Sequence, residues 1–561
     1  MSTHPGSPDA ATGSGPFGTM DSAGLKRLLA GSAEFALLDV RETGTFSSGH
    51  IFRSVSLPLS HLETRAGILV PNRRTPVVLI DAGDGGLALR AAGRLADWGY
   101  TNIALLDGGL RKWQQEGNPL YSGIYVPNKA FGEFVEHRCA TPHIDAPTLM
   151  RWQKEGKDMV ILDSRPYEEF VQFSLPGGIN CPGAELVHRA FSLARRPETT
   201  IVVNCAGRTR SIIGAQSLIN AGIPNPVVSL KDGTAGWFLH GGKLRENATE
   251  VAAPPTPEGL QRALAASQEV ARRFGVAEID ATQLARLKDD AGRSLFLLDV
   301  RTPEEYFAGH RPDSRSAPGG QLIQSTEQYV GVHGARIVLV DDNGVRARMT
   351  ASWLLQLGWR EVYVLRDGLK DAGALQRGPE PATAMGQPVE PDFISVAEAR
   401  ALWEQDQATF LDLSDSLTYR RGHIPRAWFV VRSRLAPGME ALRGEGPVVA
   451  VSKGGRFAAL AAADIRAATR RPVRVLKGGT RAWLAAGLDL AGGWERMGSE
   501  TDDVWYSPYD FDDREASMKA YLSWEVGLVA QLEREAGVLF SMPPAQSRQP
   551  APLKASDRSP E

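Results

Sequence analysis

The sequence is poor in cysteine. Only 3 of its 561 residues are cysteine, at positions 139, 181 and 205, which is too few for a disulfide framework. No CxxC pair or nearby histidine cluster accompanies them, so the sequence predicts neither a metal site nor a bound cofactor. These absences favour a protein of a reducing compartment.

The chain also lacks an excess of one charge and a long apolar run. Its 63 Lys and Arg residues face 65 Asp and Glu residues, so no overall field favours nucleic acid or an anionic membrane. No run approaches the roughly 18 apolar residues of a membrane span, and residues 1–18 lack the basic and apolar regions of a signal peptide. We therefore expect a cytoplasmic protein whose partners are small molecules or proteins, and neither nucleic acid nor a membrane.

What the sequence does contain is one pattern repeated four times. Each copy has an apolar strand that ends in aspartate, then a second apolar strand, then a Gly-rich turn. The first landmark falls at Asp39, Asp163, Asp299 and Asp412. The second follows 42, 42, 42 and 40 residues later, at Asp81, Cys205, Asp341 and Ser452. The third follows after a further 27, 28, 27 and 27 residues, at Gly108, Gly233, Gly368 and Gly479. Three matching spacings in four copies predict four related domains.

Stretches with helical periodicity, such as residues 87–99 and 211–222, lie between these strands and end in glycine. Strands that alternate with helices of this length predict the α/β class, with small doubly wound domains whose parallel sheets are covered by helices on both faces. The expected domains are 19–127, 135–250, 258–385 with a linker helix at its start, and 390–495, followed by a tail at 496–561.

The connecting segments predict how the domains are arranged. The short link between the first two copies favours these two as the packed pair, with the Pro-rich stretch at 253–257 as the division between two halves of the chain. The tail is aromatic-rich and then helical over residues 502–537, so we expect it to pack back on the domains and to end in a disordered stretch from Pro543.

The loop NCAGRTRS, at residues 204–211, places Cys205 directly after an apolar strand. Ligands of parallel sheets bind beyond the carboxyl ends of the strands, where the N–H groups of the turn and of the next helix make an anion cradle. Arg208 and Arg210 add positive charge, which favours a reactive thiolate. We therefore predict Cys205 as a nucleophile, with an ordinary buried thiol as the alternative. The predicted substrate-binding residues are Ala206, Gly207, Arg208, Thr209, Arg210, Ser211 and Arg165.

With this loop, the LLDVR strands at 37–41 and 297–301 and the GHI or GH-x-P motifs at His50, His310 and His423, the chain resembles a tandem array of four rhodanese domains. The second copy has SLPGG at 174–178 in place of the histidine motif. The resemblance implies a sulfurtransferase in which Cys205 takes sulfur from a thiosulfate-like anion and passes it to cyanide, a thiol or a protein acceptor. The other three copies lack the cysteine and are expected to be scaffolds.

Two other functions remain open at this stage. The loop is similar to the Cys-x5-Arg cradle of protein tyrosine phosphatases, but its six residues from Cys205 to Arg210 are one fewer than that cradle has. The array is also compatible with a binding or regulatory protein that uses all four domains without catalysis, as three of its copies are expected to do.

Overall fold

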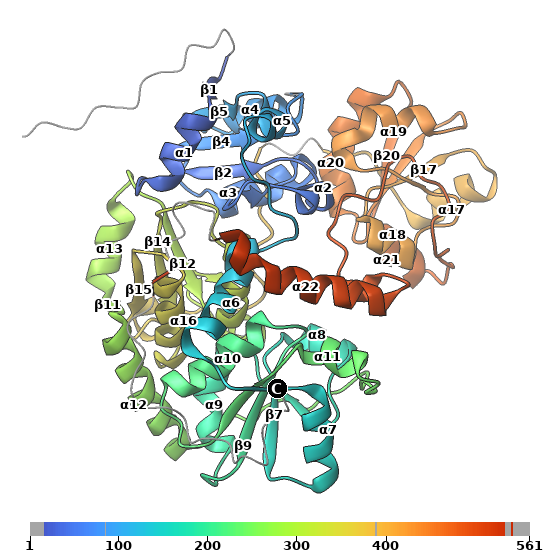
Figure 1. Cartoon of the computed structure of the whole chain (residues 1–561). Coiled ribbons are helices and arrows are strands. Elements are labelled where there is room, and N and C mark those ends of the chain that lie inside the picture. The colour runs from blue at the N-terminus through green and yellow to red at the C-terminus, as the bar shows by residue number, and fades with distance from the viewer. Residues whose placement is uncertain (1–15, 85, 387–389, 533–539, 542–561) are drawn as a thin grey trace, which may run out of the picture.

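A computed structural model describes residues 16–84, 86–386, 390–532 and 540–541. Within these residues the chain forms four five-stranded sheets in which every strand pair is parallel. The strand order is the same in each, as in β1-β5-β4-β2-β3 of the first sheet. The predicted α/β class and the four tandem domains, called repeats 1 to 4 below, are confirmed (Figure 1). No helix in the described ranges is long and apolar enough to cross a membrane.

The first two repeats have matching elements. The strands of repeat 1 are β1 (Gly18–Met20), β2 (Ala36–Asp39), β3 (Val55–Ser56), β4 (Val77–Ile80) and β5 (Ile103–Leu106), and its α-helices are α1 (Ser22–Ala30), α2 (Thr43–Ser48), α3 (Leu62–Leu69), α4 (Gly86–Asp97) and α5 (Gly109–Gln115). Helix α6 (Val126–Cys139) follows. The strands of repeat 2 are β6 (His143–Ile144), β7 (Met159–Asp163), β8 (Gly178–Asn180), β9 (Thr200–Asn204) and β10 (Val227–Leu230), and its helices are α7 (Ala146–Glu155), α8 (Tyr167–Gln172), α9 (Glu185–Leu193), α10 (Thr209–Asn220) and α11 (Gly233–Leu239).

Helix α12 (Pro257–Phe274) leads into the second half. The strands of repeat 3 are β11 (Ala277–Ile279), β12 (Leu295–Asp299), β13 (Arg315–Ser316), β14 (Arg336–Val340) and β15 (Val362–Leu365), with α13 (Ala281–Asp289), α14 (Pro303–Ala308), α15 (Gly319–Gln324) and α16 (Val345–Gln356). Repeat 4 has β16 (Phe393–Ile394), β17 (Thr409–Asp412), β18 (Trp428–Phe429), β19 (Val448–Val451) and β20 (Val473–Leu476), with α17 (Val396–Glu404), α18 (Ser416–Arg421), α19 (Leu435–Ala441), α20 (Arg456–Ala468) and α21 (Gly479–Ala485). The tail contains the short 3-10 helix η5 (Pro508–Asp510) and the long helix α22 (Arg514–Leu532).

The central strands carry continuous apolar runs because helices cover both faces of each sheet. All four residues of β2 and of β4 are buried, as are all five of β9. The aspartate of the first landmark ends the second strand of each repeat and is itself fully buried, as Asp39, Asp163 and Asp299 are. Each of these three carboxylates pairs with the arginine two residues later, which fixes the turn after the strand.

Repeat 1 shares an apolar core with repeat 3, which the short link to repeat 2 did not predict; Ile212 and Ile213, at the start of α10 in repeat 2, also belong to this core. One apolar core runs from β2 and β4 of repeat 1 to β12 and β14 of repeat 3. A second core joins repeat 2 to repeat 3 through α9, α12 and α16. The link between the first two repeats is the 14-residue helix α6, which spans about 21 Å and so carries the chain away from repeat 1. Figure 1 shows repeat 3 beside both.

Repeat 4 contacts repeat 1 through buried and half-buried polar groups. Arg432 pairs with Glu63 at 2.5 Å, Arg94 pairs with Asp464 at 2.6 Å, and Ser433 Oγ donates a hydrogen bond to Glu42 Oε1 at 2.6 Å. Burial raises the pKa of Glu42 to about 7, although the hydroxyls of Ser433 and Ser60 partly offset the shift. The interface therefore contains a carboxyl group that the folded chain prefers to keep protonated.

We expect this carboxyl group to make stability fall as pH rises. Between the ordinary glutamate pKa of 4.5 and about 7, the folded chain retains a proton on Glu42 that the unfolded chain has lost. Ionisation at higher pH then costs up to about 3 kcal/mol. Glu42→Gln removes this cost. The melting temperature of the variant, relative to that of the wild type, should therefore increase as the pH rises from 5 to 8. A constant difference across this range would contradict the assignment.

Candidate active site

Cys205 lies at the carboxyl end of β9, in the turn that leads into α10. Its side chain is 2% exposed, and its Sγ lies 3.6 Å from Ser211 Oγ, which donates a hydrogen bond to Arg208 O at 2.8 Å. Gly233, the third landmark of this repeat, packs against the backbone of Cys205. Gly233 has a φ of 54°, and a Cβ there would lie 2.2 Å from the carbonyl oxygen of Cys205. A side chain at this position would displace the cysteine.

The loops of the Cys-less repeats show where the backbone N–H groups of this turn converge. Asp341 accepts hydrogen bonds from the N–H groups 3, 5 and 6 residues later, at 2.6, 3.0 and 3.2 Å. Asp81 accepts two backbone hydrogen bonds, from the N–H groups 2 and 7 residues later, at 2.9 and 3.0 Å. Ser452 Oγ accepts one, from the N–H group 6 residues later, at 3.1 Å. In each case the target is the tip of the side chain at the end of the strand.

Repeat 2 keeps the same turn but leaves its N–H groups available. Counted in the same way from Cys205, the converging N–H groups are those of Arg208, Arg210 and Ser211. Within the described part of the chain, no acceptor takes a hydrogen bond from the N–H groups of residues 206–211. The cradle that the side chains of repeats 1, 3 and 4 fill is therefore open around the sulfur of Cys205, at the positive end of α10.

The guanidinium of Arg208 is held by acidic side chains, whereas its predicted contact with the substrate stays a prediction. Its guanidinium is 6% exposed and bonds Glu133 at 2.7 and 2.8 Å, with further ion pairs to Glu136 and Asp232. Two of these carboxylates belong to α6. Because its donors are taken by three acidic side chains, Arg208 anchors the loop to α6 and has little charge left for a ligand.

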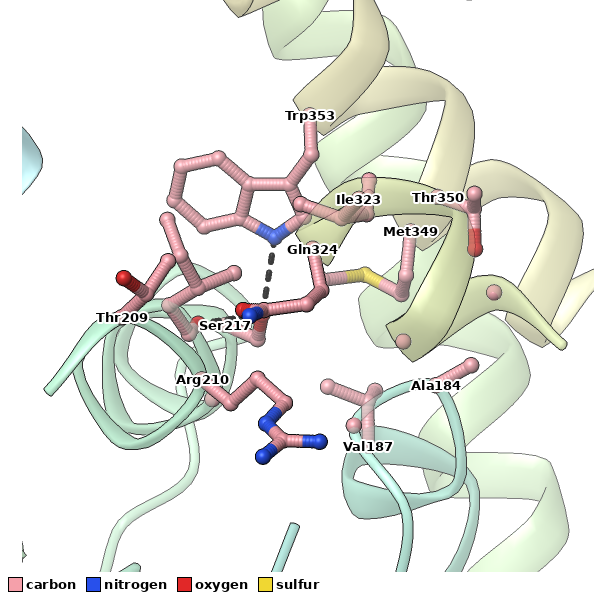
Figure 2. A pocket seen from close by; sticks show the side chains of 15 residues that line it. Ala184, Val187, Thr209, Arg210, Ser217, Ile323, Gln324, Met349, Thr350 and Trp353 are labelled. Carbon is pink, nitrogen blue, oxygen red and sulfur yellow. Dashed lines mark hydrogen bonds between the residues drawn. The ribbon is translucent and has the colours of Figure 1, made fainter. Parts of the chain in front are cut away.

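Arg210 lies at the border between repeats 2 and 3. Its guanidinium bonds both carboxylate oxygens of Glu169, at 2.7 and 2.8 Å, and lies 3.2 Å from Gln321 Oε1 of repeat 3. It lines a small cavity of about 30 Å³ at this border, where Figure 2 shows it on the α10 side and Met349 and Trp353 on the α16 side. Arg210 also lines the larger cavity described below.

Arg165 forms the same structural pair as its counterparts in the Cys-less repeats. It is fully buried, bonds Asp163 at 2.7 and 2.9 Å and donates to Phe173 O at 2.6 Å. It is not among the residues that line the cavity beside the cysteine loop. The structure therefore gives Arg165 the role of fixing the turn after β7, as Arg41 and Arg301 do in their repeats.

A cavity of about 1140 Å³ opens beside the loop at Ala206 and Arg210. Its walls come from several parts of the chain. They include Lys129 of α6, Glu169 and Phe173 of repeat 2, Gln321 and Gln324 of repeat 3, Arg421 of repeat 4, and Trp505, Tyr509 and Tyr521 of the tail. Pockets of about 300–1,000 Å³ hold drug-sized ligands, so this cavity exceeds the needs of a small anion. The site belongs to the whole chain and not to repeat 2 alone.

The tail packs on the folded repeats, as the sequence predicted. Helix α22 crosses between repeats 1 and 4 on one side and repeat 2 on the other, and it contacts α6 (Figure 1). It lies directly on the cysteine loop, because a Cβ at Gly207 would come within 3.1 Å of Glu525 Oε2 and 3.3 Å of Tyr521 Cε1. The predicted disordered end, from Pro543, lies outside the described residues.

Two tail tyrosines stand beside the loop. Tyr509 Oη lies 2.9 Å from Thr234 Oγ1, and Tyr521 Oη donates to Glu525 Oε1 at 2.8 Å. Burial raises the pKa of Tyr509 to about 12 and that of Tyr521 well above its ordinary value, and a charge on Cys205 contributes to both increases. Both hydroxyls therefore stay protonated at neutral pH, close to the sulfur.

The sequence prediction missed the part that α6 plays, although a signal was present. Lys129, Gly132, Glu133 and Glu136 recur at the 3- and 4-residue spacing of one helix face. All four meet the loop or the tail helix that covers it. A Cβ at Gly132 would lie 2.8 Å from Thr209 Cγ2, so this glycine allows α6 to approach the start of α10. The segment that looked like a linker supports the cysteine loop.

The other two cysteines lie in different surroundings. Burial raises the pKa of the Cys181 thiol well above its ordinary value, and it also raises that of Cys139. Both side chains are therefore thiols at neutral pH, and neither lines the large cavity. Among the described residues, no group of three or more His, Cys, Asp or Glu side chains could hold a metal ion.

Comparison with known families agrees with this geometry. A model of the rhodanese-like domain matches residues 22–116, 145–240, 280–374 and 395–486, which is more than half of the chain. The chain therefore belongs to the rhodanese family, and each of its four repeats is a rhodanese-like domain. No curated protein matches the chain at a significant level.

Among solved structures, the chain is similar to the thiosulfate sulfurtransferase from Pseudomonas aeruginosa. The two are 44% identical, the match covers 93% of this chain and 99% of that one, and the TM-score is 0.88. Two other solved structures match much shorter stretches. The BH2092 protein from Bacillus halodurans is 21% identical, and the match covers 22% of this chain and 87% of that one with a TM-score of 0.17. The Alr3790 protein from Anabaena is 25% identical, and the match covers 18% of this chain and 81% of that one with a TM-score of 0.17. The first match supports a rhodanese-like transferase.

Proposed function

We propose that the chain is a sulfurtransferase that moves the sulfane sulfur of thiosulfate, or of a similar anion, to a thiol or cyanide acceptor through a persulfide on Cys205. The observation that carries this proposal is the open cradle. Cys205 places its sulfur where the side chains of the other three repeats fill the corresponding turn. The family and the similarity to a thiosulfate sulfurtransferase over 93% of the chain support the same reaction.

In the first half-reaction, the Cys205 thiolate attacks the outer sulfur of thiosulfate. A bond forms between Sγ and that sulfur, the sulfur–sulfur bond of the donor breaks, and sulfite leaves with the electron pair. The outer sulfur keeps a negative charge as a persulfide. The N–H groups of residues 206–211 and the N-terminus of α10 surround this position and stabilise the charge before and after transfer.

In the second half-reaction, an acceptor nucleophile attacks the outer sulfur of the persulfide. The new bond forms as the bond between Sγ and the outer sulfur breaks, and the electron pair of that bond returns to Sγ, which becomes a thiolate again. With cyanide the product is thiocyanate, and with a thiol it is a new persulfide. The cavity of about 1140 Å³ leaves room for an acceptor much larger than cyanide.

Without an acceptor, we expect thiosulfate to release a single burst of sulfite, about one molecule per chain. The reason is that the persulfide cannot turn over until a nucleophile removes the outer sulfur. With cyanide present, the initial rates should follow double-displacement kinetics. Stopped-flow detection of sulfite measures the burst. Continuous hydrolysis of an aryl phosphate with no sulfite burst would instead favour the phosphatase alternative, and inertness toward both would favour a non-catalytic array.

A further inference from the structure

Lys129 is a buried cation that belongs to none of the four repeats but lines the active-site cavity. It lies on α6, is 3% exposed and contributes to the cavity wall together with Ala206 and Arg210. Its Nζ bonds Glu525 Oε1 at 2.9 Å and also bonds Tyr521 Oη, both from α22. Two helices outside the repeats thus bring an ammonium group to the site.

Its charge acts on Glu169, the carboxylate that holds Arg210 of the cysteine loop. Burial alone would raise the pKa of Glu169, but Arg210, with smaller contributions from Arg165 and Lys129, lowers it below its ordinary value. Lys129 is therefore close enough to influence the carboxylate that holds Arg210. Tyr521 bonds Lys129, and the charges of Arg210 and Cys205 both contribute to the pKa of its hydroxyl. The ammonium group lines the cavity beside the cysteine loop, together with Ala206 and Arg210.

The two arginines of the loop already have carboxylate partners. Arg208 is surrounded by three carboxylates, and both terminal nitrogens of Arg210 are held by Glu169. Lys129 has three N–H donors, and two of them go to Glu525 and Tyr521. Its Nζ also lies 4.7 Å from the ring centre of Tyr521 and 5.6 Å from that of Trp524, and one donor is left without an acceptor among the described residues. Glu525 is 1% exposed, and its Oε2 lies against Gly207 and has no partner among the described residues.

We propose that Lys129 binds the anionic end of the sulfur donor, and that Glu525 and Tyr521 of the tail position it. This inference rests on the proposed function. While the outer sulfur of thiosulfate meets Cys205, its sulfonate group extends into the cavity. A buried ammonium group whose position is fixed by two partners loses little entropy when it binds that group. The tail then contributes to donor recognition and does more than cover the loop.

The test uses the full chain with two substitutions in one variant, because Lys129→Met alone leaves Glu525 as an unpaired buried charge and can unfold the protein. The double variant Lys129→Met/Glu525→Gln removes both charges and should melt near the wild-type temperature. We still expect its KM for thiosulfate to rise about tenfold or more, as for the loss of a hydrogen bond to a charged group. At saturating thiosulfate it should still form the Cys205 persulfide.

A second donor separates recognition of charge from a general loss of structure. Benzenethiosulfonate carries one negative charge where thiosulfate carries two, so its KM should rise less in the double variant. Lys154→Met, at an exposed lysine of α7, is the control and should leave both values unchanged. A wild-type KM for thiosulfate in the folded double variant, or equal increases for the two donors, would overturn the inference. If the wild type takes sulfur from neither donor, the proposed function itself fails.

Discussion

Cys205→Ser is expected to abolish thiocyanate formation from thiosulfate and cyanide, with a loss of roughly 1,000-fold or more. A serine hydroxyl in the same cradle has no base to activate it and is a poor nucleophile toward sulfur. The substitution is nearly isosteric in a position that is 2% exposed, so the fold should not change. Steady-state assay of thiocyanate, together with a thermal melt of the variant, checks both parts of the expectation.

The other two cysteines provide matched controls. Cys181→Ser and Cys139→Ser should keep the transfer rate, because burial raises the pKa of both thiols and neither lies in the cysteine loop at residues 204–211. Cys181 is 1% exposed, so its variant also controls for the cost of placing a hydroxyl in a buried site. Loss of transfer in either control, with Cys205→Ser active, would move the nucleophile elsewhere.

The second large effect concerns the tail. Leu528 is fully buried where α22 packs on Val126 and Ala130 of α6, so Leu528→Asp places a charge in an apolar contact and should release the helix. We expect transfer to fall by roughly 100-fold or more, because release of the helix misplaces Tyr521, Glu525 and Lys129 beside the loop. Transfer rates and limited proteolysis of the tail measure the two consequences together.

The same helix supplies the control. Val526, two residues earlier, is 50% exposed, and Val526→Asp should leave both the docked helix and the rate unchanged. Full activity in Leu528→Asp, with the tail shown by proteolysis to be released, would mean that repeat 2 and its neighbours complete the site without α22.

The repeat pattern was sufficient to predict the fold, because each landmark residue meets a structural requirement within its own repeat. The buried aspartates pair with an arginine two residues later, and Gly233, after β10, lies where any side chain would collide with the carbonyl of Cys205. Constraints of this kind act within one repeat, so they leave a spacing that can be read along the chain. The strand end, the cysteine and the helix that begins at Thr209 follow from the same local logic.

The arrangement of the repeats and the completed site could not be predicted in this way. Arg208 looked like a ligand-binding cation because its partners, Glu133 and Glu136, lie about 70 residues earlier in an apparent linker. Lys129 and Glu525 are separated by 396 residues, and nothing in either segment alone indicates that they meet. Such contacts depend on how repeats 1, 2 and 3 share their cores. Sequence spacing does not record this.

The most direct measurement is the position of the sulfur that the protein accepts. After incubation of the full chain with thiosulfate and no acceptor, mass spectrometry of the intact protein and of its peptides should find one added sulfur atom, on the peptide that contains Cys205. Addition of cyanide should remove it. No added sulfur, or sulfur on the peptides of Cys139 or Cys181, would contradict the assignment of Cys205 as the sulfur-carrying nucleophile.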